Sequence, residues 1–338
     1  MQIIVKKNIL IIGNLGYVGS KLTEMIDYKK FSVYGLDIGL FQNKTIYKNL
    51  KEKNIKQYYC DVRNLNDKIL ANKQIVIYLA AISNDPMGQK FKKITYDINY
   101  KTTVRVAKLA KKLGTECFVF ASSCSVYGSY GNKSKKENFK LNPLTVYAKS
   151  KIYSEKALKK IASKNFKVFS LRFATACGES SRLRLDLVLN DFVFSALYNK
   201  EIKILSDGKP FRPLIDVRDM SRAIIFCFDY EKIKKNYLCV NTGSNSWNFT
   251  VLQLAQKVSK VLGNIPLKVL AERPSDKRSY KVNFDAFKQI APNNYPKMKI
   301  DDTILNLKKK MILKKINKED LIRLNILDKR IKEKFIKA

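Results

Sequence analysis

The side chains best suited to proton transfer in this sequence are a tyrosine and a lysine four residues apart, in the segment Tyr147-Ala-Lys-Ser-Lys151. On a helix, residues at this spacing share one face. An ammonium group close to a phenol favours the phenolate, so a tyrosine with an ordinary pKa of about 10 can act as a base near neutrality. Taken alone, the pattern also fits a solvated helix face, because the chain is rich in both residue types.

Histidine is absent from the 338 residues, which narrows the possible chemistry. Its absence excludes Ser-His-Asp and Cys-His nucleophile systems, His-ligated zinc and any histidine acid or base. Proton chemistry in this chain must therefore use Tyr, Lys, Asp, Glu, Cys or Ser, and we predict no metal site. A hydroxyl candidate is Ser123, in Ala121-Ser-Ser-Cys-Ser-Val-Tyr-Gly128 after an apolar run. Serines in such places are also common turn formers.

A glycine-rich segment, Gly13-Asn-Leu-Gly16-Tyr-Val-Gly19, follows an apolar run and opens an amphipathic stretch. Glycines there allow a tight turn and a close approach of the backbone to a pyrophosphate at a helix N-terminus. Asp37 closes the next apolar run, where a carboxylate accepts hydrogen bonds from ribose hydroxyls and repels a 2′-phosphate. No arginine follows it directly, so NAD is favoured over NADP. Asp61 is placed to meet the adenine, although both aspartates also fit as turn residues.

The chain carries 66 Lys plus Arg against 29 Asp plus Glu, a formal charge of +37. Such a charge can indicate nucleic-acid binding. Here the basic residues are spread along the chain, and no zinc-finger, RNP-type or basic-tail motif accompanies them. We interpret them as lysine-rich solvated surface and predict no nucleic-acid partner.

The cysteines and the apolar runs indicate the compartment. The six cysteines form no CxxC pair, which favours reduced thiols in a cytosol. The apolar run after Lys7 stops at Gly13 without a cleavage site, and no run approaches the roughly 18 residues that span a bilayer. We predict a cytoplasmic protein without a membrane partner.

Short apolar runs alternate with amphipathic stretches in the first half of the chain. This alternation predicts a Rossmann-like, doubly wound parallel α/β sheet with helices on both faces. Ligands bind beyond the carboxyl ends of such strands, so the glycine loop, Asp37 and Ser123 are expected to meet at one edge. The predicted strands are 9–12, 32–36, 57–60, 75–79, 117–121 and 168–171, and the predicted helices are 17–28, 94–113 and 144–163.

After about Arg172 the pattern indicates a second, smaller α/β region that is interleaved with the first. Thr250 is a candidate helix cap. The predicted helices are 185–198, 218–230 and 250–262, the predicted strands are 202–205, 213–217 and 238–241, and the tail from Asp301 is expected to be helical and charged.

Together and in this order, the glycine loop, the ribose aspartate, the serine-bearing strand end and the Tyr-Lys pair resemble the extended short-chain dehydrogenase/reductase superfamily. Within it they are most similar to the NAD-dependent nucleotide-sugar epimerase/dehydratase family. The resemblance covers roughly residues 7–310. It also includes Leu79-Ala-Ala81, Asn99, Leu171-Arg-Phe-Ala-Thr-Ala176, Asn190, Arg212 and Arg273.

The resemblance implies a division of the chain and a role for each of these residues. Residues 1–175 and 213–242 would form the NAD-binding Rossmann domain, 176–212 and 243–310 the nucleotide-sugar-binding region, and 311–338 a charged helical tail without an assigned role. The residues implied to hold NAD are Gly13, Gly16, Gly19, Asp37, Asp61, Val62, Leu79, Ala80, Ala81, Asn99, Tyr147 and Lys151. The implied catalytic residues are Ser123, Tyr147 and Lys151, and the implied substrate contacts are Ser123, Thr175, Asn190, Arg212 and Arg273.

Positions 124 and 125 depart from several branches of the family. Its 4,6-dehydratases carry an Asp-Glu pair where this chain has Cys124 and Ser125, and its decarboxylating members place Glu at position 125. Both activities are therefore disfavoured. Epimerisation at C3 and C5 uses a Cys and a His, so the missing histidine argues against it, while Cys124 keeps that option open. Thr175 stands where 4-epimerases often have Asn, which puts that contact in question.

Our hypothesis from the sequence is an NAD-dependent nucleotide-sugar epimerase that acts at C4 through a transient 4-keto intermediate, with Tyr147 as the base. Residues 181–191 resemble a subgroup from bacterial surface-polysaccharide pathways. Because that subgroup includes sugar-nucleotide 4-dehydrogenases as well as epimerases, a nucleotide-sugar 4-dehydrogenase or 4-ketoreductase is the alternative. A non-catalytic nucleotide- or RNA-binding protein on the same fold is more remote, because such relatives usually lose the Tyr or the Lys. The family resemblance also implies a homodimer.

Overall fold

The structure is a computed structural model that describes residues 6–83, 85–129, 133–270, 278–313 and 316–332. Arg273, which the sequence predicts to contact the substrate, lies outside the described residues. Within the described ranges, every helix is too short or too polar to cross a bilayer.

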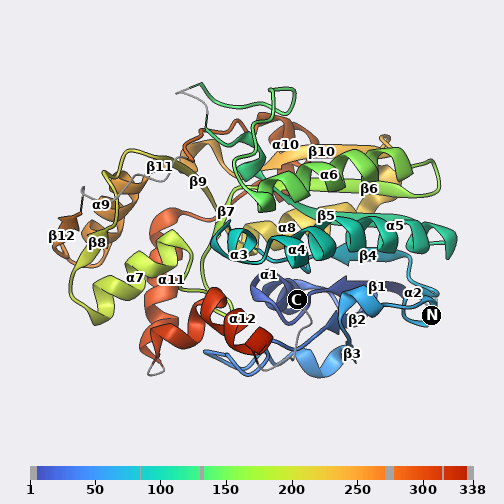
Figure 1. Ribbon diagram of the computed structural model, residues 1–338, viewed down its shortest axis with the longest axis horizontal. Helices are drawn as coiled ribbons and strands as arrows, with labels where there is room; N and C mark the ends of the chain where they lie inside the picture. The colour runs from blue at the N-terminus through green and yellow to red at the C-terminus, as the bar shows by residue number, and fades with distance from the viewer. Residues whose placement is uncertain (1–5, 84, 130–132, 271–277, 314–315, 333–338) are drawn as a thin grey trace.

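A seven-stranded parallel sheet with the order β10-β6-β5-β4-β1-β2-β3 runs through the centre of the molecule (Figure 1). Each strand predicted in the first half of the chain is present, which confirms the doubly wound α/β fold. The strands of this sheet are β1 (Lys7–Ile12), β2 (Phe31–Asp37), β3 (Lys56–Tyr59), β4 (Ile75–Tyr78), β5 (Cys117–Ser123), β6 (Lys167–Phe173) and β10 (Tyr237–Thr242).

Alternate residues of each strand enter two apolar cores, one on either face of the sheet. In β1, Ile9 and Ile11 belong to the core on the side of α1 and α8, whereas Leu10 and Ile12 belong to the core on the side of α5 and α6. The helices that cover the sheet are α1 (Tyr17–Met25), α2 (Asp67–Leu70), α3 (Asp85–Lys90), α4 (Lys92–Tyr96), α5 (Thr103–Lys112), α6 (Val146–Ile161), α8 (Val217–Phe226) and α10 (Asp285–Ile290). The helix predicted at 94–113 is α4 and α5, joined by a π-helical segment, Asp97–Thr102.

The second region has a core of its own, to which Leu189, Leu254 and Leu307 contribute. As predicted, Thr250 caps a helix, and it forms a capping box with Gln253. The elements of this region are β7 (Thr175–Cys177), α7 (Val188–Tyr198), β8 (Ile202–Ile204), β9 (Phe211–Asp216), β11 (Asn248–Thr250), α9 (Val251–Val261), β12 (Leu267–Val269) and α11 (Ile300–Ile312).

The strand predicted at 213–217 is present, but it does not join the central sheet. It is β9, and it lies in a separate three-stranded sheet, β11-β9-β7. The place beside β6 is taken by β10, which pairs with β6 in parallel along its whole length. An apolar run indicates a strand, but the partner depends on which sheet edge is still open when the chain is packed.

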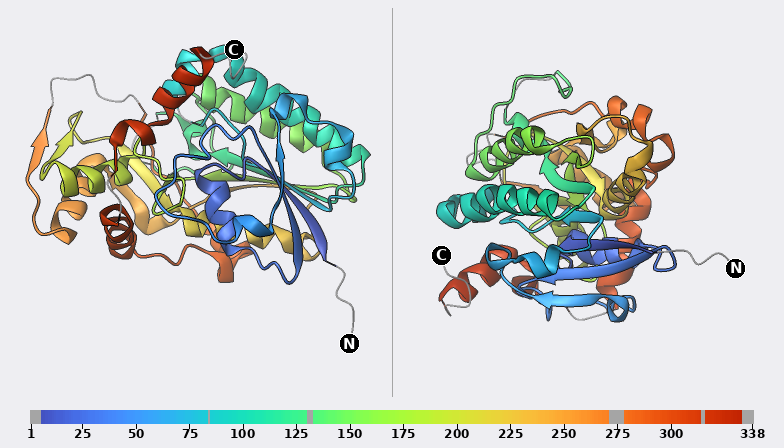
Figure 2. Two further views of the ribbon diagram at one scale, coloured as in Figure 1. Left: turned by 90° about the horizontal axis from the view of Figure 1, so that it is seen from below. Right: turned by 90° about the vertical axis from the view of Figure 1, so that its right-hand side faces the viewer.

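The end of the chain returns to the central sheet. After α11, a short helical turn (Lys318–Leu321) leads into α12 (Arg323–Lys332), which contacts α3. Figure 2 shows α12 beside the helices of one face of the sheet. The tail is therefore helical, as predicted, and it packs against the body of the protein.

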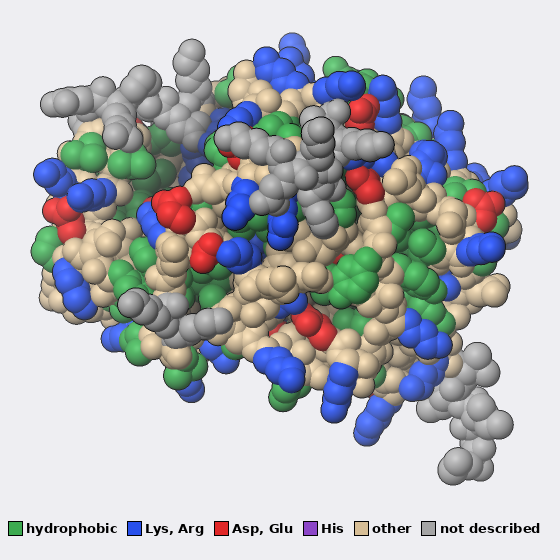
Figure 3. Space-filling model, turned by 60° about the horizontal axis from the view of Figure 1, so that its bottom comes forward, with side chains coloured by type: hydrophobic (Ala, Val, Ile, Leu, Met, Phe, Trp, Pro, Cys, Tyr) green, Lys and Arg blue, Asp and Glu red, His purple; other side chains and the backbone are tan. Residues whose placement is uncertain are grey.

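Basic side chains are numerous on the face drawn in Figure 3 and do not form one stripe there. On the face drawn in Figure 3, Lys and Arg lie among acidic, polar and apolar side chains. This distribution matches the interpretation of the charge as a property of the solvated surface.

Candidate active site

The turn between β1 and α1 is so tight that only glycine fits at two of its positions. Gly13 has a φ of +94°, and a Cβ there would lie 2.7 Å from the backbone nitrogen of Ala80. A Cβ at Gly19 would lie 2.2 Å from the carbonyl oxygen of Gly13. At these glycines a ligand can approach the backbone closely. A dinucleotide's diphosphate requires this close approach.

Two aspartates face the same pocket from the ends of β2 and β3. Asp37 accepts hydrogen bonds from the backbone nitrogens of Gly39 at 2.8 Å and Leu15 at 3.2 Å, one on each carboxylate oxygen. Each oxygen keeps a further lone pair, which suits ribose hydroxyls. Burial raises the pKa of Asp37, and the two backbone hydrogen bonds act against that rise. The carboxylate of Asp61 is paired with Arg63 at 2.8 Å.

Most of the residues predicted to hold the cofactor line this one pocket, namely Gly13, Gly16, Gly19, Asp37, Asp61, Val62, Leu79, Ala80 and Ala81. Asn99 lies behind it. Its amide oxygen accepts from the backbone nitrogen of Ile82 at 2.9 Å, and its amide nitrogen donates to the Ile82 carbonyl at 3.0 Å. Asn99 therefore positions a segment of the pocket wall.

Ser123, Tyr147 and Lys151 meet at the carboxyl end of β5. Ser123 ends the strand, and its hydroxyl lies close enough to the Tyr147 phenol to act on that residue's pKa. Lys151 follows one turn later on α6, where its Nζ lies 5.5 Å from the centre of the Tyr147 ring. The same Nζ donates to the carbonyl oxygen of Ala121 at 2.7 Å. A phenol, a hydroxyl and an ammonium group are thus gathered at one point.

Desolvation dominates the proton affinities of this trio. Desolvation and the charge of Asp85 raise the pKa of Tyr147 to about 12, although Ser123 and Arg184 act to lower it. Desolvation lowers the pKa of Lys151 to about 7, against the influence of Glu155. From the sequence we expected Lys151 to bring the pKa of Tyr147 down, but the net shift is upward. An ammonium beside a phenol favours the phenolate, but both groups lose hydration on burial, and that loss has the larger effect on Tyr147.

Replacing Lys151 with Met is expected to stabilise the fold at neutral pH. Because the folded pKa of about 7 lies below the ordinary lysine value, the unfolded chain binds more protons between pH 7 and about pH 10, and the free energy of unfolding rises with pH there. The buried ammonium thus costs stability at pH 7. Calorimetry should show K151M melting a few degrees above the wild type at pH 7, with a smaller difference at pH 10. K149M, at an exposed position of the same helix, is the control. A lower melting temperature for K151M at pH 7 would contradict the expectation.

Two of the predicted substrate contacts, Thr175 and Asn190, lie in β7 and in α7. Thr175 opens this strand and is half-buried. Asn190 is fully buried. Its amide oxygen accepts from the backbone nitrogen of Gly178 at 3.0 Å, and its amide nitrogen donates to the carbonyl of Arg184 at 3.0 Å. Both ends of the Asn190 amide are therefore used to hold the loop between β7 and α7.

Arg212, a further predicted contact, is joined to α6 through residues that the sequence did not single out. It lies in β9 and donates to the carbonyl oxygen of Arg278. The Arg278 guanidinium contacts the carboxylate of Asp85, which accepts a hydrogen bond from Thr145. Thr145 is the N-cap of α6, the helix that carries Tyr147. Asp85 and Arg278 carried no local signal, because only the fold brings them together.

Arg184 is another residue that the sequence analysis did not name individually, although it lies in the distinctive 181–191 stretch. It lines the dinucleotide pocket and also influences Tyr147. Its guanidinium pairs with Asp186 at 2.7 Å and donates to Ser83 at 2.9 Å. Arg184 thus lies between the pocket and the Ser-Tyr-Lys trio, where an anionic ligand group would meet it.

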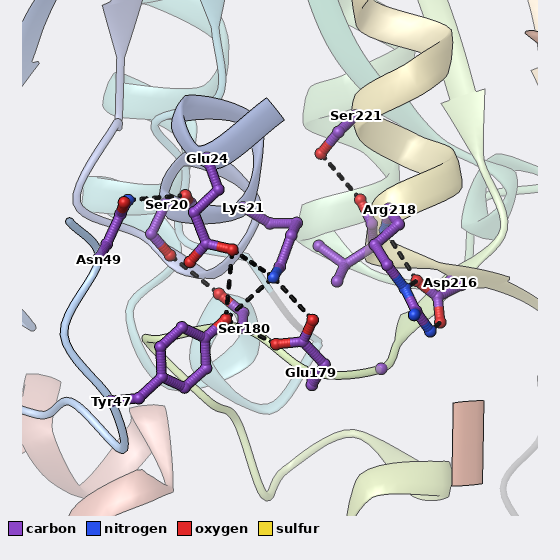
Figure 4. A network of polar contacts seen from close by, with 12 residues as sticks. Ser20, Lys21, Glu24, Tyr47, Asn49, Glu179, Ser180, Asp216, Arg218 and Ser221 are labelled. Carbon is purple, nitrogen blue, oxygen red and sulfur yellow. Dashed lines mark hydrogen bonds and ion pairs between the residues drawn. The ribbon is translucent and has the colours of Figure 1, made fainter. Parts of the chain in front are cut away.

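A polar network fixes the loop that carries Arg184 against α1 (Figure 4). The Nζ of Lys21 donates to Glu179 at 2.8 Å, and the hydroxyls of Ser20 and Ser180 lie 2.8 Å apart. Lys21 and Ser20 belong to α1, whereas Glu179 and Ser180 follow β7. The network ties the second region to the glycine-turn helix and so fixes one wall of the pocket.

Cys124 is held as a neutral thiol. It is 1% exposed, its Sγ lies 3.0 Å from the carbonyl oxygen of Arg172, and burial raises its pKa well above the ordinary value. A neutral, buried thiol is a poor base. Epimerisation at C3 and C5, which the presence of Cys124 left open, would therefore lack a base at position 124.

Comparisons with known proteins identify the family. The profile of the NAD dependent epimerase/dehydratase family matches residues 9–240. An uncharacterised UDP-glucose epimerase of Bacillus subtilis is 30% identical over 231 residues, which cover 64% of this chain and 71% of that protein.

Solved structures show the same fold at lower identity. The UDP-N-acetylglucosamine 4-epimerase from Methanobrevibacter ruminantium, in complex with UDP-N-acetylmuramic acid, matches with a TM-score of 0.80 and 23% identity over 91% of this chain and 98% of that one. The UDP-glucose 4-epimerase from Bifidobacterium longum, in complex with NAD+ and UDP, matches with a TM-score of 0.76 and 19% identity, over 90% and 98%. The glycine turn and Asp37 fit an adenine dinucleotide. With the match to the family profile, they show that this chain is an enzyme of the NAD-dependent epimerase/dehydratase family and that NAD is its cofactor.

Proposed function

We propose that this enzyme is a nucleotide-sugar epimerase that inverts C4 through a transient 4-keto intermediate. The observation that carries the proposal is the grouping of Ser123, Tyr147 and Lys151 at the carboxyl end of β5, with two side chains that carry no carboxylate, Cys124 and Ser125, directly after Ser123. A base and a hydroxyl can thus act on one carbinol, while positions 124 and 125 supply no acid pair to remove water from the sugar. The 4-epimerase activities named for the two solved neighbours support the same class.

In the proposed mechanism, Tyr147 takes the proton from the C4 hydroxyl and later returns it, while Ser123 hydrogen-bonds the same oxygen. The ammonium of Lys151, beside the ring, favours the phenolate against the burial that opposes it. The chemistry that NAD supplies when bound is reversible hydride transfer. Arg212 and Arg278 are placed to hold the diphosphate of the sugar nucleotide, because guanidinium groups match phosphate oxygens.

The test is an incubation with UDP-, GDP- and CDP-sugars, with separation of the C4 epimers and continuous absorbance at 340 nm. An epimerase interconverts the two sugars without a net change at 340 nm. A lasting rise at 340 nm with a keto-sugar product would overturn the proposal in favour of the 4-dehydrogenase or 4-ketoreductase. Nucleotide sugars left unchanged throughout would overturn both.

We also propose a homodimer, formed through the face of α6 that carries Tyr153. This side chain is 42% exposed, and its ring centroid lies 5.5 Å from that of Tyr100 and 6.2 Å from that of Tyr96. Clustered tyrosines on a helix face are typical of protein–protein contacts. The proposed face lies on the same helix as Tyr147 and Lys151.

A further inference from the structure

The C-terminal helix α12 joins two walls of the dinucleotide pocket. Its Ile326 and Leu327 pack in one apolar cluster with Leu40, from the loop after β2, and with Ile82 and Met87, from the segment after β4. Leu327 itself lines the pocket. The family profile ends at residue 240, so this helix lies outside the part of the chain that defines the family.

The first residue of α12, Arg323, projects into the same pocket. It is only 2% exposed, and its guanidinium carbon lies 3.9 Å from the centre of the Phe41 ring. Its Nη2 donates to the carbonyl oxygen of Arg182 at 2.9 Å. Its Nη1 is buried and has no hydrogen-bond partner among the described residues. A buried guanidinium nitrogen without a partner is costly, which indicates a ligand group that completes it.

Charged groups of both signs surround Arg323: Arg182 and Arg184 repel it, whereas Asp186 and Asp37 attract it. Arg182 is paired with Glu52 at 3.2 Å and Arg184 with Asp186 at 2.7 Å. Burial, followed by repulsion from Arg184, lowers the pKa of Arg323 to about 9. An anion entering the pocket would offset both effects.

We propose that Arg323 binds the diphosphate of NAD and that α12 closes the dinucleotide pocket over it. Guanidinium groups are donors only and phosphate oxygens are acceptors, so the unpartnered Nη1 matches the diphosphate. The other phosphate that a dinucleotide can carry, on the ribose 2′-hydroxyl, would meet the Asp37 carboxylate. The proposal concerns the cofactor alone and holds whichever sugar is turned over.

The first experiment measures the affinity of nucleotide-free protein for NAD, ADP-ribose and adenosine by calorimetry. We expect R323Q to weaken NAD and ADP-ribose about 10- to 100-fold, as for a lost charged hydrogen bond, and adenosine less than about threefold. R323K should recover part of the loss. The control, K329Q, removes one positive charge from an exposed position of α12 and should bind like the wild type. Unchanged NAD affinity in R323Q, or an equal loss for adenosine and ADP-ribose, would overturn the diphosphate contact. A loss confined to NADP would reassign Arg323 to the 2′-phosphate.

The second experiment uses the wild-type chain and so does not depend on how R323Q folds. Amide hydrogen exchange in residues 322–331 is compared without ligand and with saturating adenosine, ADP-ribose or NAD. We expect slower exchange with NAD and ADP-ribose than with adenosine, because the contact between Arg323 and the diphosphate reduces local opening of α12. Equal exchange in all four samples would overturn the closure by α12. Neither readout requires turnover, so both remain decisive even if the proposed epimerase activity is wrong.

Discussion

Replacing Tyr147 with Phe is expected to lower kcat for C4 epimerisation by about 10³-fold, because one positioned acid–base group contributes roughly 10²–10⁴-fold. The substitution removes only the hydroxyl that Ser123 contacts and leaves the ring beside Lys151 in place. Binding of NAD should change little, and this can be measured with the same preparation. The loss should therefore appear in kcat, as for a group that acts in the transition state.

The matched control is Y153F, the same change on an exposed tyrosine of the same helix, which should retain near-normal kcat. Tyr147 must lose a proton, and its pKa of about 12 lies above neutrality, so log kcat/KM should rise with pH below about pH 7. Above that pH, Lys151 loses its ammonium, with a pKa of about 7, and the profile should level off. The mechanism fails if Y147F keeps more than about a tenth of the activity.

Replacing Glu155 with Ala is expected to reduce the free energy of unfolding by about 3–5 kcal/mol, because it leaves a buried guanidinium unpaired. The carboxylate of Glu155 receives two bonds from Arg172, at 2.7 Å from Nη2 and 3.0 Å from Nε. The two side chains are 6% and 7% exposed. Urea unfolding of wild type and E155A measures the loss.

Two further variants show whether the loss of stability comes from breaking the buried Glu155–Arg172 pair or from removing any glutamate. E231A breaks the pair with Lys7 at the surface, where Glu231 is 67% exposed, and should cost less than about 1 kcal/mol. The double variant E155M/R172M removes both charges and should regain most of the stability that E155A loses. If E155A unfolds at the same urea concentration as the wild type, the pair does not support the fold.

The Glu155 pair also bears on the active site. Glu155 lies one turn after Lys151 on α6, and it accepts a hydrogen bond from Ser122, the neighbour of Ser123. It raises the pKa of Lys151 against the larger effect of desolvation. The sequence analysis noticed Arg172 only as part of a family segment, because two residues of opposite charge 17 positions apart carry no periodic signal.

The sequence determined the features that depend on local pattern. Apolar runs bounded by turn residues predicted each strand of the Rossmann-like half to within about two residues, because buried parallel strands are short and continuous in their apolar character. Gly13 and Gly19 were identified because no side chain can replace them in so tight a turn. The spacing of Tyr147 and Lys151 placed both on one helix face, and the structure brings Ser123 to them.

Contacts between segments that lie far apart in the chain were decided only by the tertiary structure. It placed β9 in a separate three-stranded sheet with β7 and β11, bonded Asn190 of α7 to the loop before that helix, and joined Asp85 to Arg278 across 193 positions of the chain. It also returned the tail to the dinucleotide pocket, where Arg323 lies beside Phe41. A local pattern indicates that a segment has an apolar face or a charge. The residues that this face or charge contacts depend on how the whole chain packs. For that reason the same sequence that named the cofactor could not show that α12, its C-terminal helix, lies against the pocket.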